Sequence, residues 1–112
     1  MPDNIQQMTG KIVETAKDVL GDKLRNVILY GSYARGDYNE DSDIDIMVLA
    51  DMGDTDVYEY EKPLWRAASR LDLENNMMVS VQIKDKNFFN EWVEVLPFYR
   101  NVMKDGVALY EN

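Results

Sequence analysis

GSYARGDYNEDSDIDIMV, residues 31–48, is the stretch that decides which fold the chain adopts. The run before it, Asn26–Tyr30, is short and apolar and suits a buried strand, and a glycine-serine step then marks a sharp turn. Ser32–Arg35 can open a brief helix that Gly36 ends. Residues 43–49 alternate aspartate with isoleucine and then become wholly apolar, as a strand with one solvent-exposed end does. The stretch therefore predicts a strand, a turn with a short helix, a polar loop and a second strand.

Outside this stretch, the spacing of apolar residues predicts further helices and strands. Steps of three, four and seven indicate amphipathic helices, and strict alternation indicates strands. Pro63 lacks a backbone donor and should kink or restart its helix, whereas Asp85 can cap a helix that Pro97 separates from the next. The predicted helices cover residues 5–20, 56–73 and 85–93, with a further helical segment at 97–105, and the predicted strands cover residues 77–83 and 107–110. This order predicts one α/β domain over residues 1–112, with a small mixed sheet flanked by helices.

The composition limits the chemistry that the chain can perform. Its 112 residues are 46% hydrophobic and 11% aromatic, which is enough to build one core and too little for two ordinary domains. The chain has no cysteine and no histidine. Disulfides, thiolate metal sites, cysteine nucleophiles and histidine bases are therefore excluded. Any reaction has to rest on carboxylates, hydroxyls, lysine or arginine.

The charge and hydropathy of the chain bear on its partners and its location. The formal net charge of −9 would repel a polyphosphate backbone, so broad binding of nucleic acid is not expected. No apolar run approaches the roughly 20 residues that a membrane-spanning helix needs. The first residues also lack the basic start and apolar middle of a signal peptide. We therefore expect a cytoplasmic protein without a membrane partner.

The spacing of the acids within the opening stretch predicts a metal site beside a phosphate site. Asp43 and Asp45 are two residues apart, so in a strand both carboxylates point to one face while the neighbouring isoleucines enter the core. Magnesium is usually held by one or two carboxylates together with the phosphates of a substrate. Gly31 and Ser32 follow a strand and open a helix, so backbone N–H groups and the serine hydroxyl can receive phosphate oxygens.

These residues resemble the signature of the polymerase-β-like nucleotidyltransferases, and most closely that of the minimal nucleotidyltransferase domains of bacteria and archaea. The likeness also extends to the helix before the motif and to the strand, helix and strand after it. The matching residues are Gly31, Ser32, Ala34, Arg35, Gly36, Ser42, Asp43 and Asp45. The resemblance implies the polymerase-β-like fold and the transfer of a nucleoside monophosphate, usually AMP from ATP, to an acceptor hydroxyl while pyrophosphate leaves.

The resemblance also assigns functions to individual residues. It implies that Gly31 and Ser32 hold the terminal phosphates and that Asp43 and Asp45 are the catalytic residues, which bind Mg²⁺ bridging the triphosphate. Arg35 either reaches a phosphate or pairs with an acid to fix the loop. Domains of this kind are often encoded beside a small helical HEPN-type toxin, to which they transfer AMP as its antitoxin. The chain has no room for a large acceptor domain, so we expect the acceptor site to form with a partner or with a second copy in a homo-oligomer.

The sequence departs from the family pattern at the third carboxylate of the site. Active members supply this acid from the strand that follows, and Ser80 occupies the corresponding position. Glu74 lies six residues earlier and can replace the acid only if the chain folds back toward the site. The departure bears more on catalysis than on nucleotide binding. A nucleotide-binding or antitoxin-type protein-binding module with impaired catalysis is therefore an alternative function. Transfer to a small molecule ranks below both, because it typically needs an additional helical domain.

The same stretch also allows interpretations without a catalytic site. A solvated acidic turn explains the acids but not their combination with the glycine-serine step. Every second residue from Asp37 to Asp43 carries a side-chain oxygen that could bind calcium, as in an EF-hand loop. However, Ser42 occupies the position of the required glycine and Val48 that of the glutamate, so the EF-hand pattern is not met. Tyr33 and Tyr38 can stack on a base but are more simply packing residues. The remaining large aromatic residues are expected to anchor the core or an interface.

Overall fold

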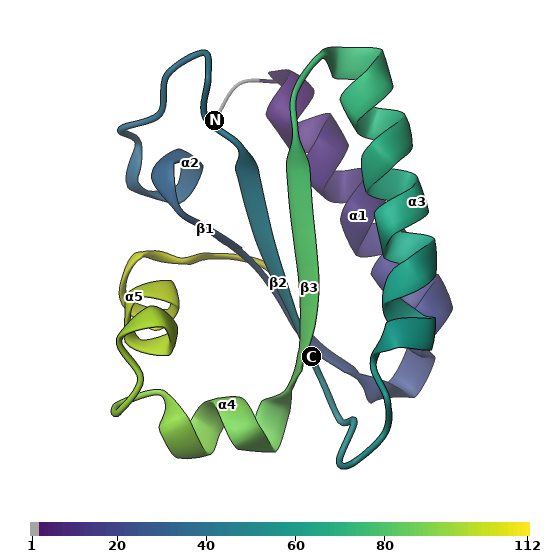
Figure 1. The fold of residues 1–112 in the computed structure, drawn as a ribbon, viewed down its shortest axis with the longest axis vertical. Helices are drawn as coiled ribbons and strands as arrows, with labels where there is room; N and C mark the ends of the chain where they lie inside the picture. Colours follow the sequence, from purple (N-terminus) through teal and green to yellow (C-terminus); the bar gives the residue numbers. More distant parts are fainter. Residues whose placement is uncertain (1–2) are drawn as a thin grey trace.

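The structure, a computed structural model, describes residues 3–112 and contains a four-stranded mixed sheet (Figure 1). The strands lie in the order β3-β2-β1-β4. β2 and β3 run parallel, whereas β1 is antiparallel to both β2 and β4. The strands are β1 at Leu24–Tyr30, β2 at Ile44–Ala50, β3 at Val79–Asp85 and β4 at Val107–Glu111. The expected α/β fold with a small mixed sheet is confirmed.

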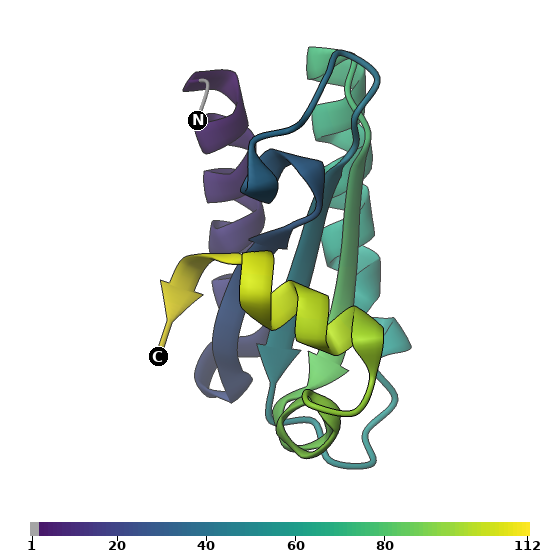
Figure 2. The same cartoon turned by 90° about the vertical axis from the view of Figure 1, so that its left-hand side faces the viewer.

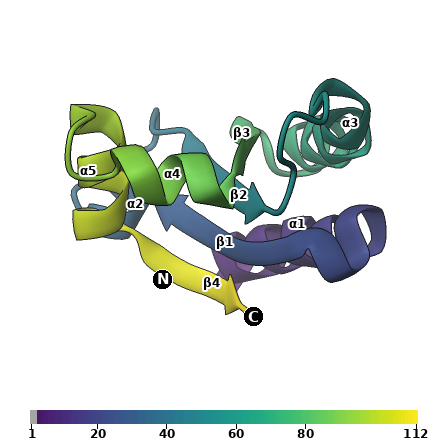
Figure 3. The same cartoon turned by 90° about the horizontal axis from the view of Figure 1, so that it is seen from below.

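The helices cover both faces of this sheet. The long helices α1 (Asp3–Leu20) and α3 (Tyr58–Asn75) pack together on one face. The shorter helices α4 (Lys86–Trp92) and α5 (Pro97–Asp105) lie on the opposite face, as the view from below shows (Figure 3). The short α2 (Ser32–Arg35) follows the end of β1. Because α4 and α5 are short, they leave one end of their face of the sheet uncovered, next to α2 (Figure 2).

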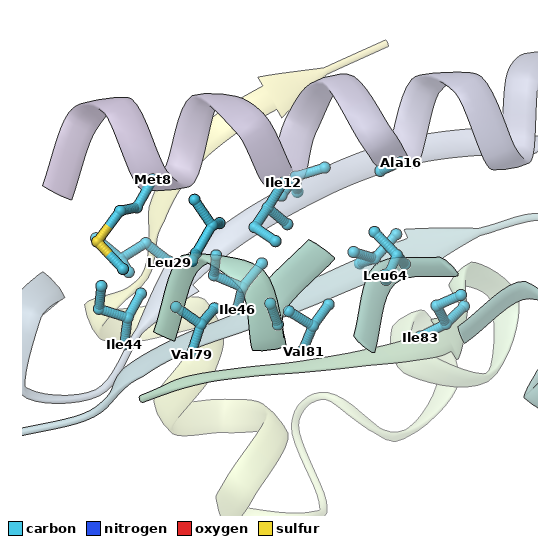
Figure 4. Close-up of a cluster of buried hydrophobic side chains, with 14 of the residues drawn as sticks. Met8, Ile12, Ala16, Leu29, Ile44, Ile46, Leu64, Val79, Val81 and Ile83 are labelled. Carbon is cyan, nitrogen blue, oxygen red and sulfur yellow. The ribbon is translucent and has the colours of Figure 1, made fainter. Parts of the chain in front are cut away.

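The main core fills the space between the long helices and the sheet. Alternate residues of β1, β2 and β3 point into it, because successive side chains of a strand face opposite ways. Figure 4 shows Met8 and Ile12 of α1 and Leu64 of α3 above Ile46 and Val81 of the sheet. Each such side chain contributes about 1.5–3 kcal/mol when it is fully buried. A smaller cluster on the other face joins Met47, Leu49, Phe89, Tyr99 and Val102.

The boundaries of the elements differ little from those predicted. α2 spans the predicted residues, and β2 begins at Ile44, where the backbone N–H donates to Met78 O at 2.8 Å. α3 passes through Pro63 without a break, so the predicted restart does not occur. Pro63 lies in the second turn, where its missing donor removes one helical hydrogen bond and the remaining packing of α3 keeps the helix intact.

The outer edge of β3 is covered by side chains of α3. Trp65 Nε1 donates to Val81 O at 3.0 Å, so this half-exposed ring is an anchor of the sheet edge. Two carboxylates accept from outward-facing backbone N–H groups of the same strand: Asp72 from Val79 at 2.7 Å and Glu61 from Ile83 at 2.9 Å. An edge whose backbone groups are paired in this way is protected against pairing with another strand.

Asp85 lies at the end of β3 that is remote from the glycine-serine turn, where it connects three segments. Its side chain accepts from Met52 N at 2.9 Å, from Gly53 N at 2.8 Å and, as the expected helix cap, from Phe88 N at 3.1 Å. Burial by itself would raise the pKa of Asp85, but the hydrogen bonds from the backbone outweigh it and hold the pKa below its usual value. The ionised carboxylate therefore stabilises the folded state.

Asp85→Ala is expected to lower the free energy of unfolding at pH 7 by about 1–3 kcal/mol, because a helix cap and two loop hydrogen bonds are lost. A carboxyl with a lowered folded pKa stabilises above its unfolded pKa, and this contribution disappears as the pH falls through the folded value. Urea unfolding of both proteins from pH 7 down to pH 3 measures the difference, which should shrink toward acid. A difference that stays constant, or an equal loss in the loop variant Asp54→Ala, would contradict this account.

Candidate active site

The site lies on the sheet face that carries α4 and α5, at the end of the strands that those helices leave uncovered. Asp45 is the second residue of β2 and sits between Tyr30 of β1 and Ser80 of β3 in the register of the sheet. Asp43 immediately precedes β2 and is exposed. The two carboxylates are close enough that the charge of Asp43 acts on the titration of Asp45. The structure therefore brings together the two predicted acids and the predicted turn.

Gly31 contacts the carboxylate of Asp45 directly. A Cβ at Gly31 would lie 2.5 Å from Asp45 Oδ2, closer than real side chains approach. The backbone at Gly31 also has φ +78° and ψ −157°, which side chains of L-residues rarely tolerate. Glycine is thus required at this position for two reasons: the backbone conformation, and the carboxylate that occupies the space of a side chain.

Gly31→Ala is expected to reduce nucleotide-dependent activity and metal binding, because the new methyl group displaces the Asp45 carboxylate. Gly36→Ala is a matched control, since Gly36 has φ +87° but no atom within 4 Å of its would-be Cβ. Both variants carry a cost of positive φ, on the order of 1–3 kcal/mol, and this cost is larger at Gly31, whose ψ of −157° lies in a region that only glycine normally occupies. Thermal melting and Mg²⁺ titration of the pair separate backbone strain from displacement. Equal Mg²⁺ affinity in the two variants would mean that the contact with Asp45 does not matter.

The local environment disfavours the charge of Asp45. Burial raises the pKa of Asp45 above its ordinary value, and the charge of Asp43 raises it further, while Arg35 acts in the opposite direction. The neighbouring Tyr30 hydroxyl has a raised pKa as well, first because of burial, and it accepts a hydrogen bond from Gln82 Nε2 at 2.8 Å. A bound cation would relieve the repulsion between the two carboxylates.

The loop between the turn and the acids is ordered by its own polar side chains. Gly31 O accepts the N–H groups of Ala34 and Arg35, both at 3.1 Å, which closes the single turn of α2. Ser42 Oγ then accepts from Asn39 N at 2.9 Å, immediately before the acid pair. Arg35 Nε donates to Asp37 Oδ2 at 3.2 Å, and both side chains are exposed. Of the two arrangements considered for Arg35, the structure has the ion pair within the loop.

Ser80 lies where the third acid was expected. It is exposed, and its Cα pairs with that of Asp45 across the parallel strands, so the two side chains lie on the same face. Glu74 does not replace it, because it lies with Lys11 and Arg70 in a groove between α1 and α3, on the other face of the sheet. Within residues 3–112, no three acidic side chains come together in a way that could hold a metal ion.

The aromatic residues near the turn divide into packing and exposed groups. Tyr33 is buried and stacks on Tyr38, with ring centroids 4.4 Å apart, so this pair packs together, as the interpretation of both tyrosines as packing residues predicts.

Sequence reasoning missed Tyr30 and Gln82, whose hydrogen bond joins β1 to β3 beside Asp45. It also missed that Phe98 contacts Tyr30 from α5, because no local pattern shows that α5 returns to the turn.

The comparison with known families agrees with the motif that the turn and the paired acids form. The model of the nucleotidyltransferase domain matches residues 11–109. The chain therefore belongs to the nucleotidyltransferase domain family, as the resemblance of its motif implies.

Two similar proteins come from Methanocaldococcus jannaschii, and each is named a "putative protein adenylyltransferase". One is 33% identical over 107 residues, covering 96% of this chain and 99% of the relative. The other is 35% identical over 91 residues, covering 79% of this chain and 90% of the relative. Both alignments are long enough to include the whole span from the turn to Ser80.

Solved structures share the fold. A crystal structure described as a "putative nucleotidyltransferase" from Sulfolobus solfataricus has a TM-score of 0.65 at 23% identity, covering 96% of this chain and 80% of that one. A structure described as a toxin–antitoxin with AMP-PNP has a TM-score of 0.57 at 27% identity, covering 92% of this chain and 73% of that one. In the described part of the chain, no helix is long and apolar enough to cross a membrane.

Proposed function

We propose that residues 1–112 act as one Mg²⁺-dependent nucleotidyltransferase domain that transfers AMP from ATP to a hydroxyl group of a partner protein. The observation that carries this proposal is the contact of the Asp45 carboxylate with the Gly31 turn, with Asp43 beside it. This contact supports the proposal, because it brings a carboxylate that could bind a cation next to the turn that we propose to hold phosphate. Family membership supports the reaction class.

The residues present fit a divalent metal ion. Two carboxylates that repel each other form the kind of oxygen-rich site that Mg²⁺ occupies, with its other ligands taken from water and from substrate phosphates. When bound, the metal neutralises charge on the phosphate oxygens and aligns the attacking and leaving groups. Asp43 and Asp45 are the residues that would hold it.

The protein's own groups position the triphosphate. The N–H and hydroxyl of Ser32 are donors at the start of α2, and with the Gly31 backbone they would hold phosphate oxygens on the side of the turn that the Asp45 carboxylate does not fill. The Arg35 guanidinium, paired with Asp37 at the exposed rim, can exchange this partner for a terminal phosphate. In the reaction the acceptor oxygen forms a bond to the α-phosphorus and gives up its proton to water, the bond between the α-phosphorus and the oxygen that bridges it to the β-phosphorus breaks, and pyrophosphate leaves.

A protein acceptor is supported by the relatives, which are named protein adenylyltransferases, and by the structural neighbours described as toxin–antitoxin complexes. We propose a small helical toxin of the HEPN type as the partner. The site is open to solvent beside Ser80 and the exposed Asp43, so a hydroxyl of a docked protein can reach it. A homo-oligomer remains a further way to complete the acceptor site.

The test follows labelled phosphate from ATP. The protein is incubated with Mg²⁺, with the product of the neighbouring reading frame, and with ATP labelled at either the α- or the γ-phosphate. Transfer of the α-label, but not of the γ-label, to the partner supports nucleotidyl transfer, and EDTA should abolish it. Transfer of the γ-label would instead indicate a kinase and would contradict the proposal.

A second function is favoured by one observation, the serine in place of the third acid beside Asp45. A domain without that acid can bind Mg²⁺ and ATP and dock to a partner without catalysis. Calorimetry distinguishes the two functions: ATP binding that depends on Mg²⁺, in a protein that transfers no label, would identify the binding module. A protein that shows neither binding nor transfer would contradict both functions.

A further inference from the structure

A small pocket opens beside the glycine-serine turn, between the turn and α5. Its volume is about 230 Å³, and it is lined by Gly31 and Arg35 on one side and by Phe98, Asn101 and Asp105 on the other. Figure 2 shows α5 crossing the sheet next to α2. The pocket therefore adjoins the proposed phosphate site but is built from a different part of the chain.

The three residues of α5 form one face of a well-anchored helix. Phe98, Asn101 and Asp105 are three and four residues apart, which places their side chains on one side of the helix. Val102 of the same helix is fully buried in the smaller core cluster, and Gly106 N donates to its carbonyl at 2.8 Å where the helix ends. The pocket wall is thus held in place by the core.

Phe98 presents a ring that is fixed in orientation but not covered. Its ring forms a T-shaped pair with the ring of Tyr30, with centroids 5.6 Å apart and planes at 79°, and Tyr30 is itself held by Gln82. The residue nevertheless remains 44% exposed. A fixed aromatic ring with a free face is a surface on which a nucleobase stacks.

The polar groups of the pocket suit a nucleoside better than a second phosphate. The Asn101 amide has an NH₂ group that can donate to N7 of adenine and an oxygen that can accept from its N6 amino group. The Asp105 carboxylate can accept from ribose hydroxyls but would repel phosphate. At the other end, Arg35 and the Gly31 backbone face the side on which the phosphates are expected.

We propose that this pocket binds the nucleoside of the substrate nucleotide, with Phe98 stacking on the base and Asn101 selecting adenine. The proposal rests on the proposed function and adds the residues that determine which nucleotide is used. A larger cavity, of about 470 Å³, does not compete for this ligand. It lies at the other end of β3 and is lined by Asp54, Asp85 and Glu91, away from the turn.

The test compares ATP with inorganic tripolyphosphate, which has the phosphates but no nucleoside. Calorimetry in the presence of Mg²⁺ measures both affinities. Phe98→Ala should weaken ATP binding about tenfold while leaving tripolyphosphate binding within about twofold of the parent. Unchanged tripolyphosphate binding also shows that the variant is folded. Phe88→Ala is the matched control, because Phe88 is 46% exposed and lies on α4 outside this pocket, so both affinities should stay as in the parent.

The choice of base is tested at Asn101. The parent should prefer ATP to GTP, and Asn101→Ala should lose about fivefold or more of that preference. ATP binding unchanged in Phe98→Ala, or a parent that binds ATP no better than tripolyphosphate, would overturn the pocket assignment and leave the proposed function standing. If Phe98→Ala instead raises the KM for the acceptor and leaves the affinity for ATP unchanged, the pocket binds the acceptor, and the assignment to the nucleoside is overturned. A parent that binds neither ATP nor tripolyphosphate would contradict the proposed function itself.

Discussion

Asp45→Asn is expected to lower the rate of nucleotidyl transfer at least about a hundredfold, because it removes the charge of the less exposed member of the acid pair. The asparagine has nearly the shape of the aspartate, so the contact with Gly31 is kept and only the charge changes. Burial and the charge of Asp43 both act against the ionised form of Asp45. The variant should therefore melt at the same temperature as the parent or higher, even though its activity is lost.

Two measurements check this expectation: the initial rate of transfer of α-labelled phosphate and thermal unfolding without metal. Asp43→Asn should also lower the rate of transfer. Asp41→Asn serves as the control, because Asp41 lies in the exposed loop and its backbone N–H, not its carboxylate, makes the loop hydrogen bond to Asn39 at 2.8 Å. Transfer that persists in Asp45→Asn at the rate of the parent would remove Asp45 from the metal site.

Much of the fold can be predicted from the sequence, because the spacing of apolar and polar residues within one segment indicates whether that segment is a helix or a strand. The alternation of acid and isoleucine before Val48 predicts a strand with one polar end, and the structure has that strand from Ile44. The helical periods before Gly21 and around Pro63 predict α1 and α3 in the same way. The position of Ser80 beside Asp45 has a different origin: it follows from the parallel pairing of β2 with β3, which no local pattern predicts.

The rest depends on packing between distant segments, which local patterns do not record. The sequence around Pro97 predicts a helix but not that Phe98 reaches Tyr30, 68 positions earlier in the chain. Asp85 is recognisable as a helix cap, whereas its hydrogen bonds to Met52 and Gly53 follow only from the direction in which the loop after β2 runs. The ion pair of Arg35 was one of two predicted arrangements, and spacing alone could not choose between them.

Ser80→Asp is expected to tighten Mg²⁺ binding about tenfold, by adding a third carboxylate where the family pattern has one. Ser80 is exposed and its Cα pairs with that of Asp45, so the new acid fits without displacing the core. Without metal, the additional negative charge beside Asp45 should lower the melting temperature. Saturating Mg²⁺ should then raise the melting temperature more in the variant than in the parent, because a ligand that binds the folded state stabilises it in proportion to its affinity.

The control for added charge is Asn90→Asp, which adds one negative charge at an exposed position of α4, outside the pocket that Ser80 lines. Its Mg²⁺ affinity should equal that of the parent, so a similar gain in both variants would mean that net charge alone attracts the ion. If Ser80→Asp binds Mg²⁺ more tightly and also transfers AMP faster, the serine limits catalysis in the natural chain. If binding tightens but no label is transferred by either protein, the serine belongs to a domain whose function is binding. An unchanged affinity would contradict the placement of Ser80 at the metal site.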